Sequence, residues 1–63
     1  MCEANAYVVR NGKEELVMEA VDTVEPDNGS LRIINIFGDQ KVVHAQIKSL
    51  ELVNHKILLE EKE

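Results

Sequence analysis

Cys2 is the only cysteine in this chain of 63 residues, and it directly follows Met1. If Met1 is removed, the α-amine and the thiolate of Cys2 can close a five-membered chelate ring on a metal ion. If Met1 stays, the amide nitrogens of Cys2 and Glu3 remain donors for a strongly binding metal. Square-planar nitrogen donors suit nickel(II) or copper(II), and thiolates strengthen binding to soft or borderline ions. The first residues therefore predict a metal site.

One chain supplies only half of a planar set of nitrogen and sulfur donors. A homodimer with twofold symmetry brings the same patch of each subunit together at its axis, so both Cys2 residues can meet on one ion. Glu3 is the second candidate ligand, through its carboxylate or its amide nitrogen, and its alternative role is that of an ordinary exposed strand residue.

Cys2 also has a purely structural interpretation. On a strand it shares a face with Ala4, Ala6 and Val8, because successive side chains alternate between the two faces. Unpaired cysteines are among the most buried residue types and behave as small apolar residues. At this point the metal ligand and the core residue both remain open.

His44 and His55 are the other candidate metal ligands, since imidazole suits nickel and zinc. Their separation matches no standard metal motif, and neither is near Cys2 in the sequence. We therefore expect both to be exposed polar residues. The sequence contains no serine–histidine–acid set with useful spacing and no phosphate-binding loop, so we do not expect an enzyme.

The charge balance argues against nucleic acid as a partner. Seven basic and twelve acidic residues give a net charge of −5, which opposes nonspecific binding to nucleic acid and to anionic membranes. Only Tyr7 and Phe37 could stack on bases. The basic residues that could form a binding face are scattered through the sequence: Arg10, Lys13, Arg32, Lys41 and Lys48.

Length and composition predict one small domain that spans residues 1–63. Such a domain buries only about 60% of the surface of its unfolded chain, so its core is marginal and dimerisation would stabilise it. Neither a signal peptide nor an apolar run long enough to span a membrane is visible. We expect a cytoplasmic protein.

Alternating apolar residues and turn signals predict an all-β fold. The expected strands are residues 2–10, 14–25, 31–37, 40–48 and 56–60. Tight turns are expected at Asn11–Gly12, at 25–30 and at Gly38–Asp39. The alternation slips near Ser49, which indicates a bulge or bend. Five short strands in so short a chain predict a small antiparallel barrel.

Residues 14–25 are ambiguous, because their apolar residues also repeat with helical spacing. We favour a strand for this segment, since a hairpin turn precedes it and valine-rich strands follow. The strand interpretations predict which side chains face the core. These are Leu16, Met18 and Ala20 in the second strand; Leu31, Ile33, Asn35 and Phe37 on one face of the third; and Val43, Ala45 and Ile47 in the fourth.

The chain resembles the CooT family, small nickel-binding accessory proteins associated with maturation of carbon monoxide dehydrogenase. The resemblance covers nearly the whole chain, and its most specific element is the opening Met-Cys-Glu, followed by Asn-Ile-Phe-Gly at residues 35–38. The other segments that carry it are 4–7, 15–19 with Val24, 39–41 and 52–60.

This resemblance implies a homodimeric, SH3-like barrel in which Cys2 of each subunit binds one nickel(II) ion at the dimer axis. It also implies a partner such as carbon monoxide dehydrogenase or its accessory proteins. Some members of the family carry only a general label as predicted RNA-binding proteins. A weaker resemblance connects the chain to hydrogenase maturation chaperones of the HypC type. These also begin Met-Cys, but they usually have a proline where residues 5–7 stand here.

Overall fold

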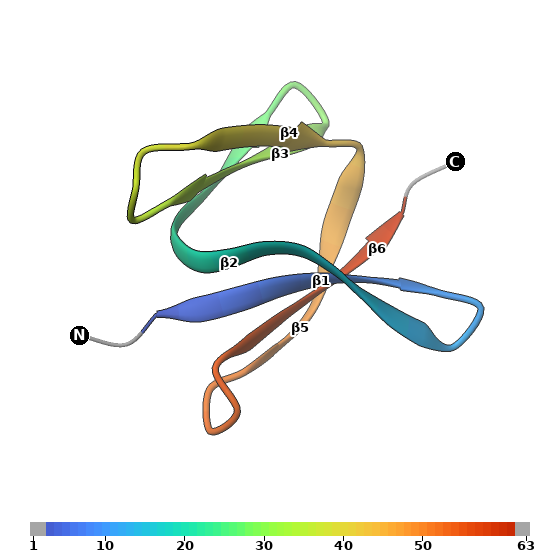
Figure 1. Ribbon diagram of the computed structural model, residues 1–63. Helices are drawn as coiled ribbons and strands as arrows, with labels where there is room; N and C mark the ends of the chain where they lie inside the picture. Colours follow the sequence, from blue (N-terminus) through green and yellow to red (C-terminus); the bar gives the residue numbers. More distant parts are fainter. Residues whose placement is uncertain (1–2, 62–63) are drawn as a thin grey trace.

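A computed structural model of the chain describes residues 3–61. These residues form a single all-β sheet of six strands that curls into a half-barrel (Figure 1). The strands are β1 (Ala4–Arg10), β2 (Lys13–Asp27), β3 (Ser30–Asn35), β4 (Gln40–Val43), β5 (Ala45–Glu51) and β6 (Lys56–Glu61). Their order across the sheet is β4-β3-β2-β1-β6-β5. The described residues contain no helix that could cross a membrane.

The prediction of five antiparallel strands is wrong in two respects. First, the expected strand 40–48 is two strands, because the chain bends at His44 and changes partner: β4 pairs with β3, whereas β5 pairs with β6. Second, β6 runs parallel to β1, with Asn5 opposite Lys56 and Val9 opposite Glu60. Tight turns reveal the antiparallel hairpins in a sequence, but a parallel pair between the two ends of the chain leaves no local signal.

Residues 14–25 are a strand, as predicted, but the strand is bulged. Ala6 lies opposite Met18 and Ala4 opposite Val21, so β2 contains one residue more than β1 between these pairs. Ala20 sits in this bulge with a φ of 55°. Consequently Met18 and Val21, three residues apart, both face the core, whereas Leu16 is 52% exposed. The bulge explains the helix-like spacing of Met18 and Val21, and Leu16 leaves the core because the register between β1 and β2 shifts a second time between Ala6 and Tyr7.

Several local predictions are confirmed. Asn11 and Gly12 have φ angles of 51° and 77°, and Asn28 and Gly29 have 51° and 84°, which are the positive angles of tight hairpin turns. The slip near Ser49 is a real irregularity, since the register between β5 and β6 shifts between Ile47 and Ser49. Ile47 was expected to be buried but is 46% exposed, on β5 at the edge of the sheet.

The core lies on the concave side of the curled sheet and is built from aliphatic side chains of five strands. Ala6, Ile33 and Leu59 are fully buried. Around them pack Met18, Val21, Leu31, Ala45 and Ile57. Phe37 was expected to share the face of Ile33, but β3 ends at Asn35 and Phe37 is 77% exposed in the following turn.

Candidate metal centre at the N-terminus

Cys2, the main predicted ligand, lies outside the residues that the structure describes. Glu3 is the first described residue and is exposed, directly before β1. The contacts at the start of β1 place Glu3 in the fold.

Asn5 fixes the start of β1 on both sides. Its backbone N–H donates a hydrogen bond to the carbonyl oxygen of His55 at 2.9 Å. Its side-chain Oδ1 accepts a hydrogen bond from the N–H of Ala20 at 3.1 Å, inside the bulge of β2. A backbone donor that is exposed by a bulge needs such a partner. The strand that follows Cys2 and Glu3 is thus held to both of its neighbours.

Glu3 lies between two hollows in the surface. One hollow is lined by Glu3 together with Ile36 and Phe37 of the β3–β4 turn. The other is lined by Glu3 together with Leu50 and Leu52 at the end of β5. In Figure 1 the start of β1, the β3–β4 turn and the β5–β6 turn all lie away from the end of β6. Glu3 therefore shares its two hollows with exposed apolar side chains of these turns.

The β3–β4 turn is held in one conformation by Asn35. Its Oδ1 accepts hydrogen bonds from the N–H of Phe37 at 3.0 Å and from the N–H of Asp39 at 2.9 Å. The N–H of Ile36 donates to the carbonyl oxygen of Ala20 at 2.9 Å, which ties the turn to the β2 bulge. The exposed Phe37 is therefore carried on a well-supported backbone.

The structure separates the two histidines. His55 lines the same hollow as Glu3, and its carbonyl oxygen bonds to β1. His44 lines a different hollow, beside Arg10 and Glu15. Sequence reasoning missed that His55 comes close to the N-terminal segment, because only the parallel β1–β6 pairing brings it there. Among residues 3–61, no group of three or more His, Asp or Glu side chains is arranged to hold a metal ion.

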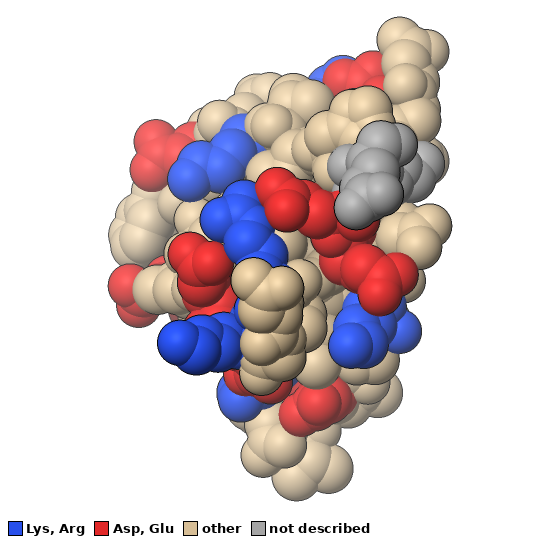
Figure 2. Space-filling model, turned by 90° about the vertical axis from the view of Figure 1, so that its right-hand side faces the viewer, with Lys and Arg blue, Asp and Glu red and all other residues tan. Residues whose placement is uncertain are grey.

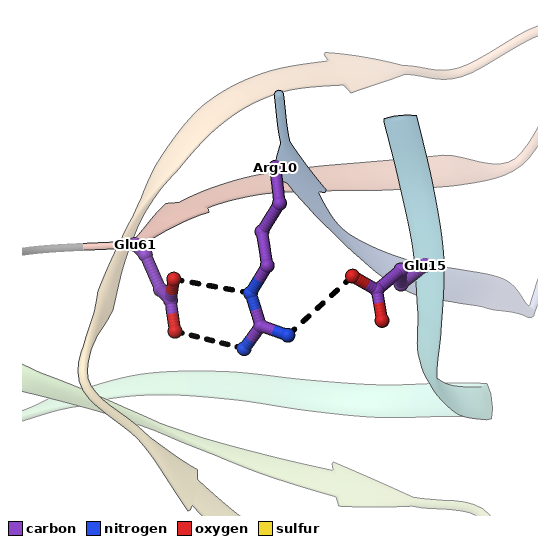
Figure 3. Close-up of polar contacts among 3 residues, drawn as sticks. All are labelled: Arg10, Glu15 and Glu61. Carbon is purple, nitrogen blue, oxygen red and sulfur yellow. Dashed lines mark hydrogen bonds and ion pairs between the residues drawn. The ribbon is translucent and has the colours of Figure 1, made fainter. Parts of the chain in front are cut away.

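The opposite end of the molecule is covered with paired charges. Arg10 donates to both carboxylate oxygens of Glu61, at 3.0 and 2.8 Å, and its third contact is Glu15 at 3.4 Å (Figure 3). The hydrogen bond and the charge of Arg10 lower the pKa of Glu61, and the same contacts with Glu61 raise the pKa of Arg10. Figure 2 shows basic and acidic side chains intermixed on this face.

Two other basic residues are also paired with carboxylates. Arg32 contacts Asp27 at 3.1 Å, and Lys56 contacts Glu14 at 3.1 Å while lying 5.3 Å from the centre of the Tyr7 ring. The hydrogen bond from Lys56 to Glu14 raises the pKa of Lys56. Of the basic residues considered for a nucleic-acid face, Arg10 and Arg32 are thus paired with carboxylates. That nucleic acid is not a partner stays a prediction.

The described residues define a small all-β protein built on one six-stranded sheet that curls into a half-barrel. Known proteins share this fold. The fold matches a crystal structure assigned to CooT of Carboxydothermus hydrogenoformans, with a TM-score of 0.92 and 52% identity over 98% of this chain and 100% of that one. An uncharacterised protein of Methanocaldococcus jannaschii is 42% identical over 60 residues, which is 95% of this chain and 98% of the relative.

The sequence profile of the family described as the CO dehydrogenase accessory protein CooT matches residues 1–60. The chain belongs to the CooT family. The resemblance found in the sequence is thereby confirmed, and so is the expectation of an accessory protein rather than an enzyme.

Proposed function

We propose that this protein binds one nickel(II) ion per homodimer and holds or delivers it during maturation of a carbon monoxide dehydrogenase-type nickel enzyme. The ligands are the Cys2 thiolate of each subunit and nitrogen donors from the same N-termini, with Glu3 as a further donor. Nickel is the cargo in this proposal. A cytoplasmic location belongs to it, because a reducing compartment keeps a lone cysteine in the thiol form.

The chemistry of the donors supports this proposal. A thiolate with adjacent nitrogen donors is suited to nickel(II) in a planar geometry. Glu3, the residue after Cys2, is exposed, which is compatible with a site that an ion can enter and leave. A mononuclear site of nitrogen and sulfur donors with no redox partner is better suited to carrying an ion than to turnover.

The observation that carries the proposal is the anchoring of the strand behind the sole cysteine. Asn5 holds β1 to the β2 bulge and to His55. We infer that this anchoring lowers the entropy cost of bringing two subunits' ligands to one ion, because the strand that follows the ligands is already ordered. Because the chain belongs to a family of CO dehydrogenase accessory proteins, we propose an enzyme of that type as the recipient of the ion.

The delivery step can be tested with purified carbon monoxide dehydrogenase that lacks nickel. The enzyme is incubated with the nickel-loaded protein in the presence of a chelator that removes free nickel(II). The proposal predicts activation by the wild-type protein and none by the Cys2→Ser variant treated in the same way. Activation that is equal for both proteins would exclude Cys2-bound nickel as the source.

Two alternatives remain from the sequence: an RNA-binding module and a HypC-like chaperone. Neither gains a specific observation from the fold. The paired cations and the net charge of −5 weaken the first, and the family match favours CooT over the second.

A further inference from the structure

A hollow of about 360 Å³, the barrel mouth, opens at the end of the half-barrel where β1 and β6 end. Its floor is aliphatic and reaches the core, since Leu59 is fully buried and Val8 and Ala45 are buried beside it. Val17 and Val43, which pack against the core, also line it. Proteins bind small molecules in the mouths of β-barrels, in hollows of roughly 300–1,000 Å³. The size of the barrel mouth therefore suits a small molecule.

The charged residues around the barrel mouth follow from strand alternation, because side chains two residues apart on a strand share a face. Arg10 stands two residues after buried Val8 on β1. Glu61 stands two residues after buried Leu59 on β6. Lys41 occupies the corresponding place on β4, and all three charged residues line the hollow. A charged layer thus surrounds an apolar floor, which is the arrangement that binds amphipathic molecules.

The charges of this layer differ in how they are paired. Arg10 donates to both carboxylate oxygens of Glu61 and to Glu15, so each of these carboxylates already has a cation (Figure 3). Lys41 donates to a backbone carbonyl oxygen on β2 at 3.2 Å, and within residues 3–61 it forms no ion pair with a carboxylate. An ammonium group has three donors, so Lys41 keeps donors for an anionic group.

We propose that the barrel mouth binds a small amphipathic organic anion, with its carboxylate or sulfonate group on Lys41 and its apolar body on the aliphatic floor. His44, at the bend between β4 and β5, lines the same hollow and offers a second polar contact. This site goes beyond the proposed function and uses no described residue of the N-terminal metal site. In the opposing view, the charged layer only closes the end of the barrel and shields the edge strand β4.

The test uses an anionic fluorescent probe of this chemistry, anilinonaphthalene sulfonate, and its uncharged analogue phenylnaphthylamine. Titration of the metal-free protein should show that the sulfonate binds with a Kd on the order of tens of micromolar. The amide NMR signals of Val8, Val43 and Leu59 should shift most. No binding, or shifts concentrated at Phe37 and Leu52 instead, would overturn the proposal.

Lys41→Gln isolates the anionic contact. It should lower the affinity for the sulfonate about tenfold, because it removes a charge-assisted hydrogen bond, and should leave the affinity for the uncharged analogue within about twofold. Lys48→Gln is the matched control, since Lys48 is exposed on β5, does not line the hollow, and its substitution removes the same charge. Equal losses in the two variants would show that only net charge acts, which would contradict a site at Lys41.

Leu16→Ser tests the apolar contact without touching the core, because Leu16 lines the barrel mouth and is 52% exposed. It should lower the affinity for both probes about threefold. Val53→Ser is its control: Val53 is 91% exposed in the β5–β6 turn and does not line the hollow, so both affinities should stay unchanged. Circular dichroism checks that every variant folds. A larger loss in Val53→Ser than in Leu16→Ser would place the probes at that turn and overturn the proposal.

Discussion

The backbone N–H of Asn5 and the carbonyl oxygen of His55 are joined by a hydrogen bond of 2.9 Å. This contact connects β1 to the turn that precedes β6. Asn5 stands three residues after Cys2 in the sequence. It makes the position of the start of β1 depend on the pairing of β1 with β6. Changes at the anchoring residues should therefore affect both stability and the metal site.

The side chain of Asn5 is expected to contribute measurably to stability. In Asn5→Ala, the N–H of Ala20 loses its acceptor in a partly buried position, and we expect a loss of about 1–3 kcal/mol in the free energy of unfolding. Urea denaturation at fixed protein concentration measures it. Asn54→Ala, which removes an exposed contact with Glu51, should change the free energy by less than about 0.5 kcal/mol. Equal effects of the two substitutions would contradict the anchoring role.

Features that depend on neighbouring residues, such as turns, could be predicted from the sequence. Features that depend on pairing between distant strands could not. Asn11–Gly12 and the slip near Ser49 identified a turn and a register shift, because their geometry depends on neighbouring residues. The bulge at Ala20 was missed, since it depends on Asn5, fifteen residues away, accepting its N–H. Cys2 is predicted as a ligand from its residue type and position alone, whereas the proximity of His55 to Glu3 requires the parallel β1–β6 pair.

Ala20 should tolerate glycine unusually well. Its φ of 55° lies in the left-handed region, which costs an L-residue about 1–2 kcal/mol and glycine very little. Ala20→Gly should therefore be at least as stable as wild type in thermal or urea unfolding. Ala45→Gly, at a buried strand position, should lose about 1 kcal/mol. A similar loss in both variants would show that the Ala20 backbone is not strained.

The Arg10–Glu61 pair predicts a specific pH dependence. The pKa of Glu61 is lowered from its ordinary value of 4.5, first by the hydrogen bond from Arg10 and then by its charge. A pKa that is lower in the folded state stabilises the protein above pH 4.5, and this contribution is lost as the pH falls through the folded-state pKa. In Arg10→Gln, the NMR titration midpoint of Glu61 should move up. Glu15→Gln is the control and should leave it low, and an unchanged midpoint in Arg10→Gln would contradict the assignment.

Nickel and dimerisation should strengthen each other. In the proposed homodimer with nickel(II) at its axis, the two Glu3 carboxylates lie near each other and repel, and the ion between the subunits offsets that repulsion. Linkage requires that the factor by which nickel lowers the dimer Kd equals the factor by which dimerisation raises nickel affinity. Sedimentation with and without nickel measures the first factor. Glu3→Gln should tighten the metal-free dimer; a weaker metal-free dimer in this variant would place Glu3 away from the axis.

The central claim is tested most directly by titrating nickel(II) into protein with its native, untagged N-terminus, monitored by thiolate-to-metal charge-transfer absorbance. We predict saturation at one ion per two chains, a diamagnetic planar centre, and weaker binding as the pH falls below the thiol pKa of about 8.5, because protons compete for the thiolate. Cys2→Ser and Cys2→Ala should abolish the absorbance and most of the affinity while the fold remains intact. Wild-type affinity and stoichiometry in the Cys2→Ala protein would contradict the account.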